Sequence, residues 1–507
     1  MKIAGLFAVP IYLDPRLDPD PEEGLGIGYV LAAARAQGHE VRLFTPLDGE
    51  AAALYRLILT YHPDILAISL FTCSLPDSVI IAREVRRRIP SIKIVVGGPH
   101  ATSTPDIAMQ PEFDYVVRGE GEETFCDLLR ALENGEDMSC VRGIVFEESG
   151  RLVSTAERAR IADLDALKYP VYDRRYYDLP AHSLSFPTAS SVKYAPMIFS
   201  RGCSMNCSFC SSREIWGRNV LSHSPESVIA EICHLQTTYG VNYVFFEDLT
   251  FAGDRDGMRA LCRHFADNLK GVSWGCETCV DSVTREDLAL MKAAGCSKII
   301  WGIESLDVAI LQGINKQQSQ ARIRRVLEMS ADLGILNWGT YMIGFPEETE
   351  ASIRSTSREL QNMDIHQLRI SIATPFPGSE WYSKISKSAL HPDLRLYDTN
   401  HLVYDHSSIS AKRMKELQNE LFVRFYGSRE YRDRLGRMIH LHPHLRESVD
   451  EWLAYIDTNI EKLAGGTVEL TQTLEWQEVQ RSYNPLQPVD EPKCKSTKGE
   501  LEVALRI

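Results

Sequence analysis

The sequence predicts an α/β protein: an N-terminal doubly wound parallel sheet, a partial (β/α)6 barrel and a helical C-terminal appendage. Apolar, β-branched runs alternate with amphipathic helical patterns five times before residue 135, which is typical of a Rossmann-like sheet. The alternation resumes six times from residue 194, and only helical patterns follow residue 398. We therefore expect a sheet domain over residues 1–140, a linker over 141–192, a barrel over 193–397, and helices with a polar tail over 398–507.

The composition is that of an ordinary globular protein, with 44% hydrophobic and 24% charged residues. A formal net charge of -14 disfavours nucleic acid or an anionic membrane as the main partner and favours a small-molecule substrate. The opening "MKIAGLFAVPIYLDP" has no signal cleavage site, and no uncharged apolar run approaches the roughly 18 residues of a membrane span. We expect a cytoplasmic protein that binds neither nucleic acid nor membrane.

Five apolar runs are the expected strands of the first sheet: "KIAGLFAV", "HEVRLFT", "DILAISLFT", "IKIVVGG" and "DYVVRGEG". Helical patterns such as "GIGYVLAAARAQG" and "EETFCDLLRAL" follow them. Ligands of such sheets bind beyond the carboxyl ends of the strands. The loops over residues 69–74, 97–102 and 119–122 are therefore the candidate binding loops. A hairpin-like "GIVFEESGRLV" and a polar stretch over 155–191 come next, where we expect the linker.

Six further runs are the expected barrel strands: "YAPMIFS", "NYVFFEDL", "VSWGCETC", "SKIIWGIES", "WGTYMIGF" and "LRISIATPF". Helical segments such as "PESVIAEICHLQTTYG" and "REDLALMKAAG" separate them. Barrels of this kind carry their chemistry on loops at the carboxyl ends of the strands. The stretch "FSRGCSMNCSFCSS", with three of the twelve cysteines, follows the first strand at that end.

These three cysteines, Cys203, Cys207 and Cys210, have the spacing C-x3-C-x2-C. In a cytoplasmic chain such a cluster indicates metal binding or catalysis. Thiolates at this density suit a cuboidal iron-sulfur cluster, and three ligands for four irons leave one iron open to an amine and a carboxylate of a ligand. The alternative is a zinc site completed by a remote His, but no second Cys or His pair lies nearby in the sequence.

With the aromatic Phe209 before Cys210, residues 194–379 resemble the radical S-adenosylmethionine (SAM) superfamily. The resemblance implies that the three cysteines hold a [4Fe-4S] cluster whose open iron binds SAM, and that Phe209 borders the cofactor. "FFEDLTF" resembles the second-strand motif, which implies that Glu247 or Asp248 receives the SAM amino group. "WGIES" resembles the fourth-strand ribose motif, which implicates Glu304 and Ser305. "YMIGFPEET" and "ATPFPGS" resemble the motifs that border adenine.

One position departs from the family pattern. Related enzymes often carry a basic residue on the third strand, where "CETCVD" places Cys279, and a thiol cannot clamp the SAM carboxylate as a guanidinium does. Cys276 and Cys279 also form a lone C-x2-C pair. We interpret both as free cysteines that bind no metal.

The first domain, over residues 2–134, resembles the cobalamin-binding domain that precedes many radical SAM barrels. "SLFTCS", "GGPHAT" and "GEGEE" follow successive strands, and small residues there let the backbone approach a flat corrinoid. The alternative is a flavodoxin-like domain without a ligand. The loop "PIYLDPRLDPDPEEGLG" contains no His, so we expect no protein imidazole below cobalt. The residues implied in cobalamin binding are Ser69, Thr72, Gly97, Gly98, Gly119 and Gly121.

Together the two resemblances imply a cobalamin-dependent radical SAM enzyme of the class B methyltransferase type, which methylates an unactivated carbon of a small metabolite. A 5'-deoxyadenosyl radical would abstract a substrate hydrogen, cobalamin would supply the methyl group, and an external one-electron reductant of the flavodoxin or ferredoxin type would be needed. The main alternative is ring closure or oxidation without methylation.

Two further alternatives remain open. A methylthiotransferase would use Cys73, Cys126 and Cys140 for a second cluster, but Cys126 lies in a helical pattern and is better explained as core. A cofactor-binding sensor without turnover would need an output module, and the sequence carries no DNA-binding or partner-binding motif.

Overall fold

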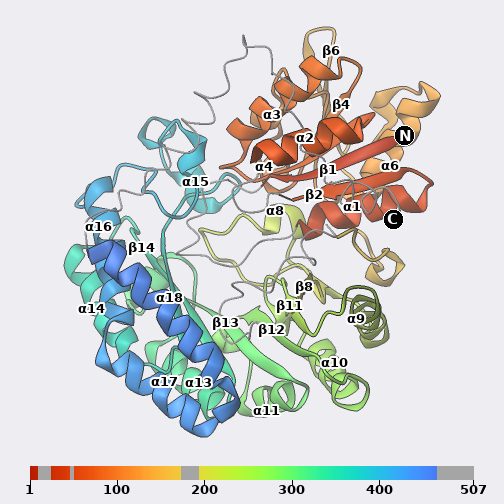
Figure 1. The fold of residues 1–507 in the computed structure, drawn as a ribbon. Helices are drawn as coiled ribbons and strands as arrows, with labels where there is room; N and C mark the ends of the chain where they lie inside the picture. Colours follow the sequence, from red (N-terminus) through yellow and green to blue (C-terminus); the bar gives the residue numbers. More distant parts are fainter. Residues whose placement is uncertain (9–23, 46–50, 173–192, 465–507) are drawn as a thin grey trace, which may run out of the picture. The chain divides into compact units, whose positions relative to one another are not determined.

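The computed structural model describes residues 1–8, 24–45, 51–172 and 193–464. The first sheet has the strand order β2-β1-β3-β4-β5-β6-β7, in which β1 to β5 are parallel. This order confirms the predicted doubly wound sheet (Figure 1). Its strands are β1 (Lys2–Ala8), β2 (Glu40–Phe44), β3 (Ile65–Leu70), β4 (Lys93–Gly97), β5 (Tyr115–Val117), β6 (Ile144–Glu148) and β7 (Arg151–Ser154).

Helices cover both faces of this sheet. Apolar side chains of α1 and α6 pack on one face and those of α2 and α3 on the other, in two separate buried clusters. The antiparallel β6–β7 hairpin pairs with β5, so a segment that the sequence prediction had placed in the linker extends the sheet. The helices are α1 (Leu25–Ala36), α2 (Ala51–Tyr61), α3 (Leu75–Arg88), α4 (Pro99–Ser103), α5 (Pro105–Ala108) and α6 (Gly121–Asn134).

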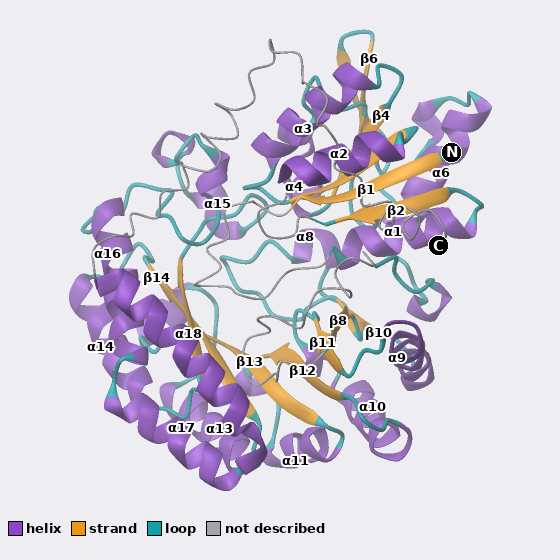
Figure 2. Ribbon diagram, viewed as in Figure 1, coloured by secondary structure: helices purple, strands orange, loops and turns teal. Residues whose placement is uncertain are grey.

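The second sheet is a curved run of six parallel strands in the order β15-β14-β13-β12-β11-β8, which confirms the partial barrel (Figure 2). In β12, Trp274 and Cys276 pack into the buried cluster beneath the helices, and Glu277, whose side chain points to the opposite face of the strand from Cys276, is half-buried. The strands are β8 (Tyr194–Met197), β11 (Tyr243–Phe246), β12 (Ser273–Thr278), β13 (Cys296–Glu304), β14 (Leu336–Ile343) and β15 (Gln367–Ile372).

Helices pack on the outer face of this sheet and share its buried cluster. They are α9 (Pro225–Tyr239), α10 (Arg255–Asn268), α11 (Arg285–Ala293), α12 (Val308–Gly313), α13 (Gln320–Asp332), α14 (Glu350–Gln361) and α15 (Glu380–Lys384). Two short elements frame the cysteine loop: the ribbon of β9 (Ser200–Arg201) with β10 (Leu221–Ser222), and α8 (Arg213–Trp216).

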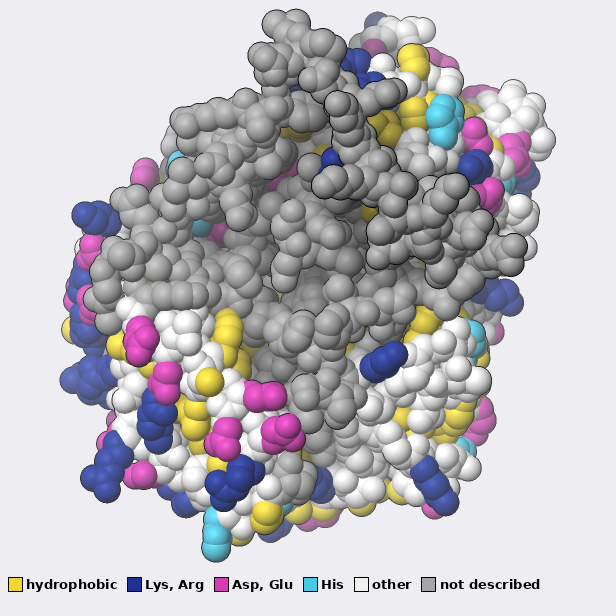
Figure 3. Space-filling model, in the orientation of Figure 1, with side chains coloured by type: hydrophobic (Ala, Val, Ile, Leu, Met, Phe, Trp, Pro, Cys, Tyr) yellow, Lys and Arg dark blue, Asp and Glu magenta, His cyan; other side chains and the backbone are white. Residues whose placement is uncertain are grey.

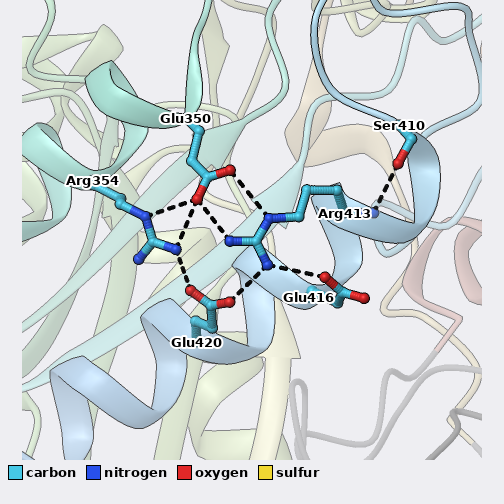
Figure 4. A network of polar contacts seen from close by, with 6 residues as sticks. All are labelled: Glu350, Arg354, Ser410, Arg413, Glu416 and Glu420. Carbon is cyan, nitrogen blue, oxygen red and sulfur yellow. Dashed lines mark hydrogen bonds and ion pairs between the residues drawn. The ribbon is translucent and has the colours of Figure 1, made fainter.

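The C-terminal region is helical, as the sequence predicts, with α16 (Ala411–Tyr426), α17 (Arg429–Leu441) and α18 (Arg446–Ala464). The Tyr426 hydroxyl accepts from the Leu368 amide at 2.7 Å, so α16 is fastened to the edge strand β15. On the surface, the Glu350 carboxylate of α14 accepts hydrogen bonds from Arg354 and Arg413. Both arginines also donate to the carboxylate of Glu420 (Figure 4). Acidic and basic side chains lie interspersed on the coloured part of the face in Figure 3.

None of the helices in the described ranges is sufficiently long and apolar to traverse a bilayer.

Candidate cofactor sites

The three motif cysteines lie on one irregular loop between β9 and α8. Gly202 begins it with φ 109°, and a Cβ there would come within 2.1 Å of the Asn219 carbonyl oxygen, so only glycine fits. The far side of the loop is held by two backbone bonds: Ser208 N donates to Ile314 O at 3.1 Å, and Trp381 N donates to Ser208 O at 2.8 Å. The loop is thus fixed just before Cys203 and again between Cys207 and Cys210.

All three thiols are half-buried, and Cys210 N donates to Cys207 O at 3.3 Å. Burial raises the pKa of Cys207 to about 12, and the Lys316 ammonium is the strongest opposing influence. Bound iron would instead hold the thiolate, because metal coordination deprotonates a thiol. In the described part of the chain no three His, Cys, Asp or Glu side chains converge as ligands of one ion. A cuboidal cluster needs no such convergence, since each thiolate binds a different iron, and this donor set fits it.

Thr250 connects the cysteine loop to the third barrel strand. Its hydroxyl lies 3.6 Å from the Cys203 sulfur and 3.9 Å from the sulfur of Cys279. The structure therefore brings Cys279 close to Cys203, one of the three predicted cluster ligands. Cys276 points the other way, into the buried layer beneath the helices. Phe209, predicted to border the cofactor, packs partly buried against the barrel core.

The two acidic candidates after β11 have different surroundings. Glu247 is exposed and accepts from the Tyr194 hydroxyl at 3.1 Å. Asp248 is buried and accepts from the amides of Phe199 and Ser200, at 2.9 and 2.5 Å, and from the Ser200 hydroxyl. Burial raises its pKa to about 7, against the lowering effect of these hydrogen bonds. Asp248 thus fixes the backbone that leads into the cysteine loop, while the Glu247 side chain lies exposed at the end of β11.

Glu304 ends β13 with φ 60°, a left-handed conformation that non-glycine residues seldom adopt outside functional sites. Its carboxylate accepts from Lys316 Nζ at 2.7 Å and from the Thr340 hydroxyl at 3.0 Å. The neighbouring Ser305 is fully buried, and its hydroxyl accepts from the Asp307 amide at 3.1 Å. The predicted ribose residues are therefore already fixed by the protein.

Sequence reasoning missed Lys316. Its side chain is 4% exposed, and its ammonium donates to Gly302 O at 2.6 Å as well as to Glu304. The pKa of Lys316 is raised, because Glu304, Cys279 and Cys207 outweigh the effect of burial. An ammonium has three donors, and these two acceptors leave one for a ligand. A lysine near the middle of "LQGINKQQSQ" has no sequence signal that separates it from a surface residue.

A second missed residue is Glu277, on β12. Burial raises its pKa to about 7, with the Glu304 carboxylate acting in the same direction and Lys316 and Arg369 opposing. The sequence offered one signal for Glu277. In "SWGCET" its side chain points to the opposite face of the strand from the apolar side chains of Trp274 and Cys276.

The predicted cobalamin residues all lie at the carboxyl ends of β3, β4 and β5. Gly98, at φ 92°, and Gly121 are explained by packing, since a Cβ would come within 2.9 Å of Ser69 Oγ and of Val30 Cγ2 respectively. Gly119 is different: at φ 72° a Cβ on it would meet no atom within 4 Å, and the nearest atom to one on Gly97 would be 3.6 Å away. Partly exposed backbone without side chains at two adjacent strand ends fits a flat macrocycle.

Thr72 does not point freely toward a ligand, because its hydroxyl lies 3.1 Å from His100 Nδ1. His100 is 2% exposed, and burial lowers its pKa to about 4. Thr102, two residues on, accepts from the Gly119 amide at 3.0 Å, which ties the second and third candidate loops together. Most of the loop in which the sequence shows no His lies outside the described residues.

A buried ion triad connects the two regions. Arg201, which directly precedes the cysteine loop, donates to Glu120 at 2.9 Å and to Glu122 at 2.6 Å, and these carboxylates follow β5 of the first sheet. All three side chains are at most 6% exposed. The cluster loop and a candidate cobalamin loop are therefore in direct contact.

Comparisons with known proteins agree with this arrangement. Residues 20–129 match the B12 binding domain model, and residues 197–360 match the radical SAM superfamily model. An uncharacterized methyltransferase of Pyrococcus horikoshii is 29% identical over 408 residues, which cover 79% of this chain and 87% of the relative. An anaerobic magnesium-protoporphyrin IX monomethyl ester cyclase of Synechocystis is 27% identical over 402 residues, covering 76% and 77%.

Among solved structures, the cobalamin-dependent SAM radical enzyme OxsB, with aqua-cobalamin and SAM bound, superposes with a TM-score of 0.63. The identity is 14%, and the match covers 97% of this chain and 82% of that chain, so it supports the fold. The two domain matches, the cysteine loop and the glycine-lined strand ends converge on a [4Fe-4S] cluster, SAM and cobalamin as cofactors. The chain therefore combines a B12 binding domain with a radical SAM domain, as cobalamin-dependent radical SAM enzymes do.

Proposed function

We propose that the enzyme transfers a methyl group to an unactivated carbon of a small metabolite. The observation that carries this proposal is the contact of the two cofactor loops through Arg201, Glu120 and Glu122. A carbon radical is short-lived, so the methyl source must wait within roughly 3 to 3.5 Å of it. Adjacent loops meet that requirement, and the relative from Pyrococcus horikoshii is named as a methyltransferase.

When bound, the cluster with SAM supplies the 5'-deoxyadenosyl radical and cobalamin supplies the methyl group. The chain's own residues bind and orient. Cys203, Cys207 and Cys210 would hold the cluster, and the negative charge of the exposed Glu247 carboxylate suits the SAM ammonium. Asp248 keeps the loop backbone in place beneath them.

Lys316 is our candidate for the SAM carboxylate clamp that Cys279 cannot supply. It is a buried cation within electrostatic reach of both Cys207 and Cys279. One of its three donors remains for a ligand after the bonds to Gly302 and Glu304. Glu304 then has a clear function, because it holds the ammonium in place and offsets its burial.

The second candidate function is ring closure or oxidation without methyl transfer, because the Synechocystis relative is named as a cyclase. The two functions differ in their products. Methyl transfer from SAM leaves S-adenosylhomocysteine, whereas radical cleavage alone leaves 5'-deoxyadenosine and methionine. The test is to supply anaerobically loaded enzyme with SAM and a one-electron reductant and to quantify both nucleosides. Formation of S-adenosylhomocysteine that requires cobalamin supports the methyltransferase, and deoxyadenosine alone supports the cyclase-like alternative.

A further inference from the structure

The Arg201 side chain contacts three segments outside its own strand: α1, α8 and the start of α6. Its backbone belongs to the β9–β10 ribbon. Its guanidinium carbon lies 5.1 Å from the ring centroid of Tyr29 on α1 and 4.9 Å from the ring centroid of Trp216 on α8. The guanidinium forks to Glu120 and Glu122 at the start of α6. One side chain thus connects the cluster loop with two helices of the first domain.

The two carboxylate partners of Arg201 are also buried and hydrogen-bonded. Glu120 and Glu122 lie where acidic residues commonly favour a helix N-terminus, but for that purpose they need no burial. Both are instead turned inward onto Arg201, and the second oxygen of Glu120 accepts from the Ile161 amide at 2.7 Å. Arg160, one residue earlier, donates to the backbone carbonyl of Arg201. The triad is therefore built into both loops.

Burying three charges is a poor way to gain stability. The desolvation penalty offsets much of the attraction, and well-packed apolar side chains of similar volume often serve as well or better. A planar fork with two acceptors does, however, fix the position of one loop relative to another. Positional precision is the property that the triad provides and an apolar contact would not.

The two ends of the triad adjoin the two cofactor sites directly. Gly202 and Cys203 follow Arg201 without a gap, and Gly119 and Gly121 flank Glu120. A cofactor that binds a loop rigidifies the segment that contacts it. A second ligand that meets an already ordered loop loses less conformational entropy, so the two binding free energies become coupled and the coupling is reciprocal.

We propose that Arg201 is a positioning residue through which cobalamin binding and cluster binding strengthen each other. The inference needs both cofactors but is independent of whether the reaction is methylation or ring closure. It predicts that hydroxocobalamin binds the cluster-loaded protein more tightly than the cluster-free protein, by roughly fivefold or more.

The test measures the dissociation constant of hydroxocobalamin by anaerobic equilibrium dialysis, with and without the cluster. A triple variant, Arg201→Met with Glu120→Gln and Glu122→Gln, removes the triad without leaving an uncompensated buried charge. We expect it to bind each cofactor but to show a ratio of the two constants near one. A ratio equal to that of the wild type would overturn the proposal, as would a wild-type ratio of one.

The first domain offers a matched control. Arg158 also pairs with two carboxylates of α6, Asp127 and, at 3.3 Å, Glu123, and its third side-chain partner, Thr124, lies on the same helix. Arg158→Met with Asp127→Asn and Glu123→Gln should keep the wild-type ratio, and an equal loss there would contradict a specific role of Arg201. If the Arg201 triple variant does not fold, Arg201→Lys replaces it. A lysine cannot span both carboxylates in one plane, so the ratio should fall, and an unchanged ratio would refute the inference.

Discussion

At the scale of single residues, the cysteine loop carries the most direct prediction. Alanine at Cys203, Cys207 or Cys210 should abolish the iron-sulfur absorption and all 5'-deoxyadenosine formation, because we assign one iron of the cluster to each thiolate. Cys279→Ala and Cys276→Ala should retain both. Cys279 is a stringent control, since its sulfur and that of Cys203 both lie within 4 Å of the Thr250 hydroxyl, at 3.9 and 3.6 Å. Iron analysis after anaerobic reconstitution checks the result, and equal iron loss in the Cys279 variant would show that the ligand set is wrong.

Lys316 carries a second prediction at this scale. Lys316→Met should weaken SAM binding to the cluster-loaded protein about tenfold or more, which is the loss expected for one charge-assisted hydrogen bond. Lys316→Arg should keep part of the affinity. Lys292 serves as the control, because its ammonium also donates to a backbone carbonyl, Gly334 O at 2.7 Å, and has no role in this account. SAM affinity that is equal in the Lys316→Met and Lys292→Met variants would remove Lys316 from the site.

At the scale of structural elements, Asp248 joins the end of β11 to the backbone of the cysteine loop and should make stability depend on pH. Its pKa of about 7 in the folded chain lies above the value near 3.9 of an unfolded Asp. The stabilisation that protonated Asp248 gives to the folded chain is fully present below about pH 4. It is lost as pH rises toward 7, because Asp248 loses its proton at a lower pH in the unfolded chain than in the folded chain. Relative to Asp248→Asn, the wild type should lose stability with a slope of at most about 1.4 kcal/mol per pH unit. Denaturant unfolding of the cofactor-free proteins between about pH 4.5 and 7.5 measures this slope, and parallel curves would contradict the buried-acid account.

The loops after β3 and β4 carry a spectroscopic prediction. We expect bound cob(II)alamin to show no nitrogen hyperfine splitting from an axial base in electron paramagnetic resonance. His100 is the imidazole closest in sequence to the predicted glycines, but it is buried and its ring nitrogens lie near the hydroxyls of Thr72 and Thr104. A splitting that disappears in His100→Gln would show that this ring leaves its pocket to bind cobalt.

The elements also show what sequence reasoning can and cannot reach. Both sheets follow from local patterns, because β-branched runs and helical periodicity are properties of neighbouring residues. The cysteine loop follows from its spacing. Lys316, Glu277 and the partners of Arg201 do not, because their roles arise from contacts between segments far apart in the chain, and a single charged residue looks the same in sequence whether it is buried or solvated. The hairpin of β6 and β7 was placed in the linker because its pairing with β5 has no local signature.

At the scale of the whole molecule, the central claim is that a radical site and a methyl source serve one reaction. The most direct measurement uses anaerobically reconstituted, cobalamin-loaded enzyme with SAM and a one-electron reductant, and it quantifies 5'-deoxyadenosine and S-adenosylhomocysteine together. We expect both products from the wild type, loss of S-adenosylhomocysteine when cobalamin is omitted, and loss of deoxyadenosine in Cys203→Ala. With the substrate present the two should accumulate in near-equal amounts. Deoxyadenosine without any S-adenosylhomocysteine in the cobalamin-loaded wild type would contradict the methyltransferase and leave ring closure or oxidation as the function.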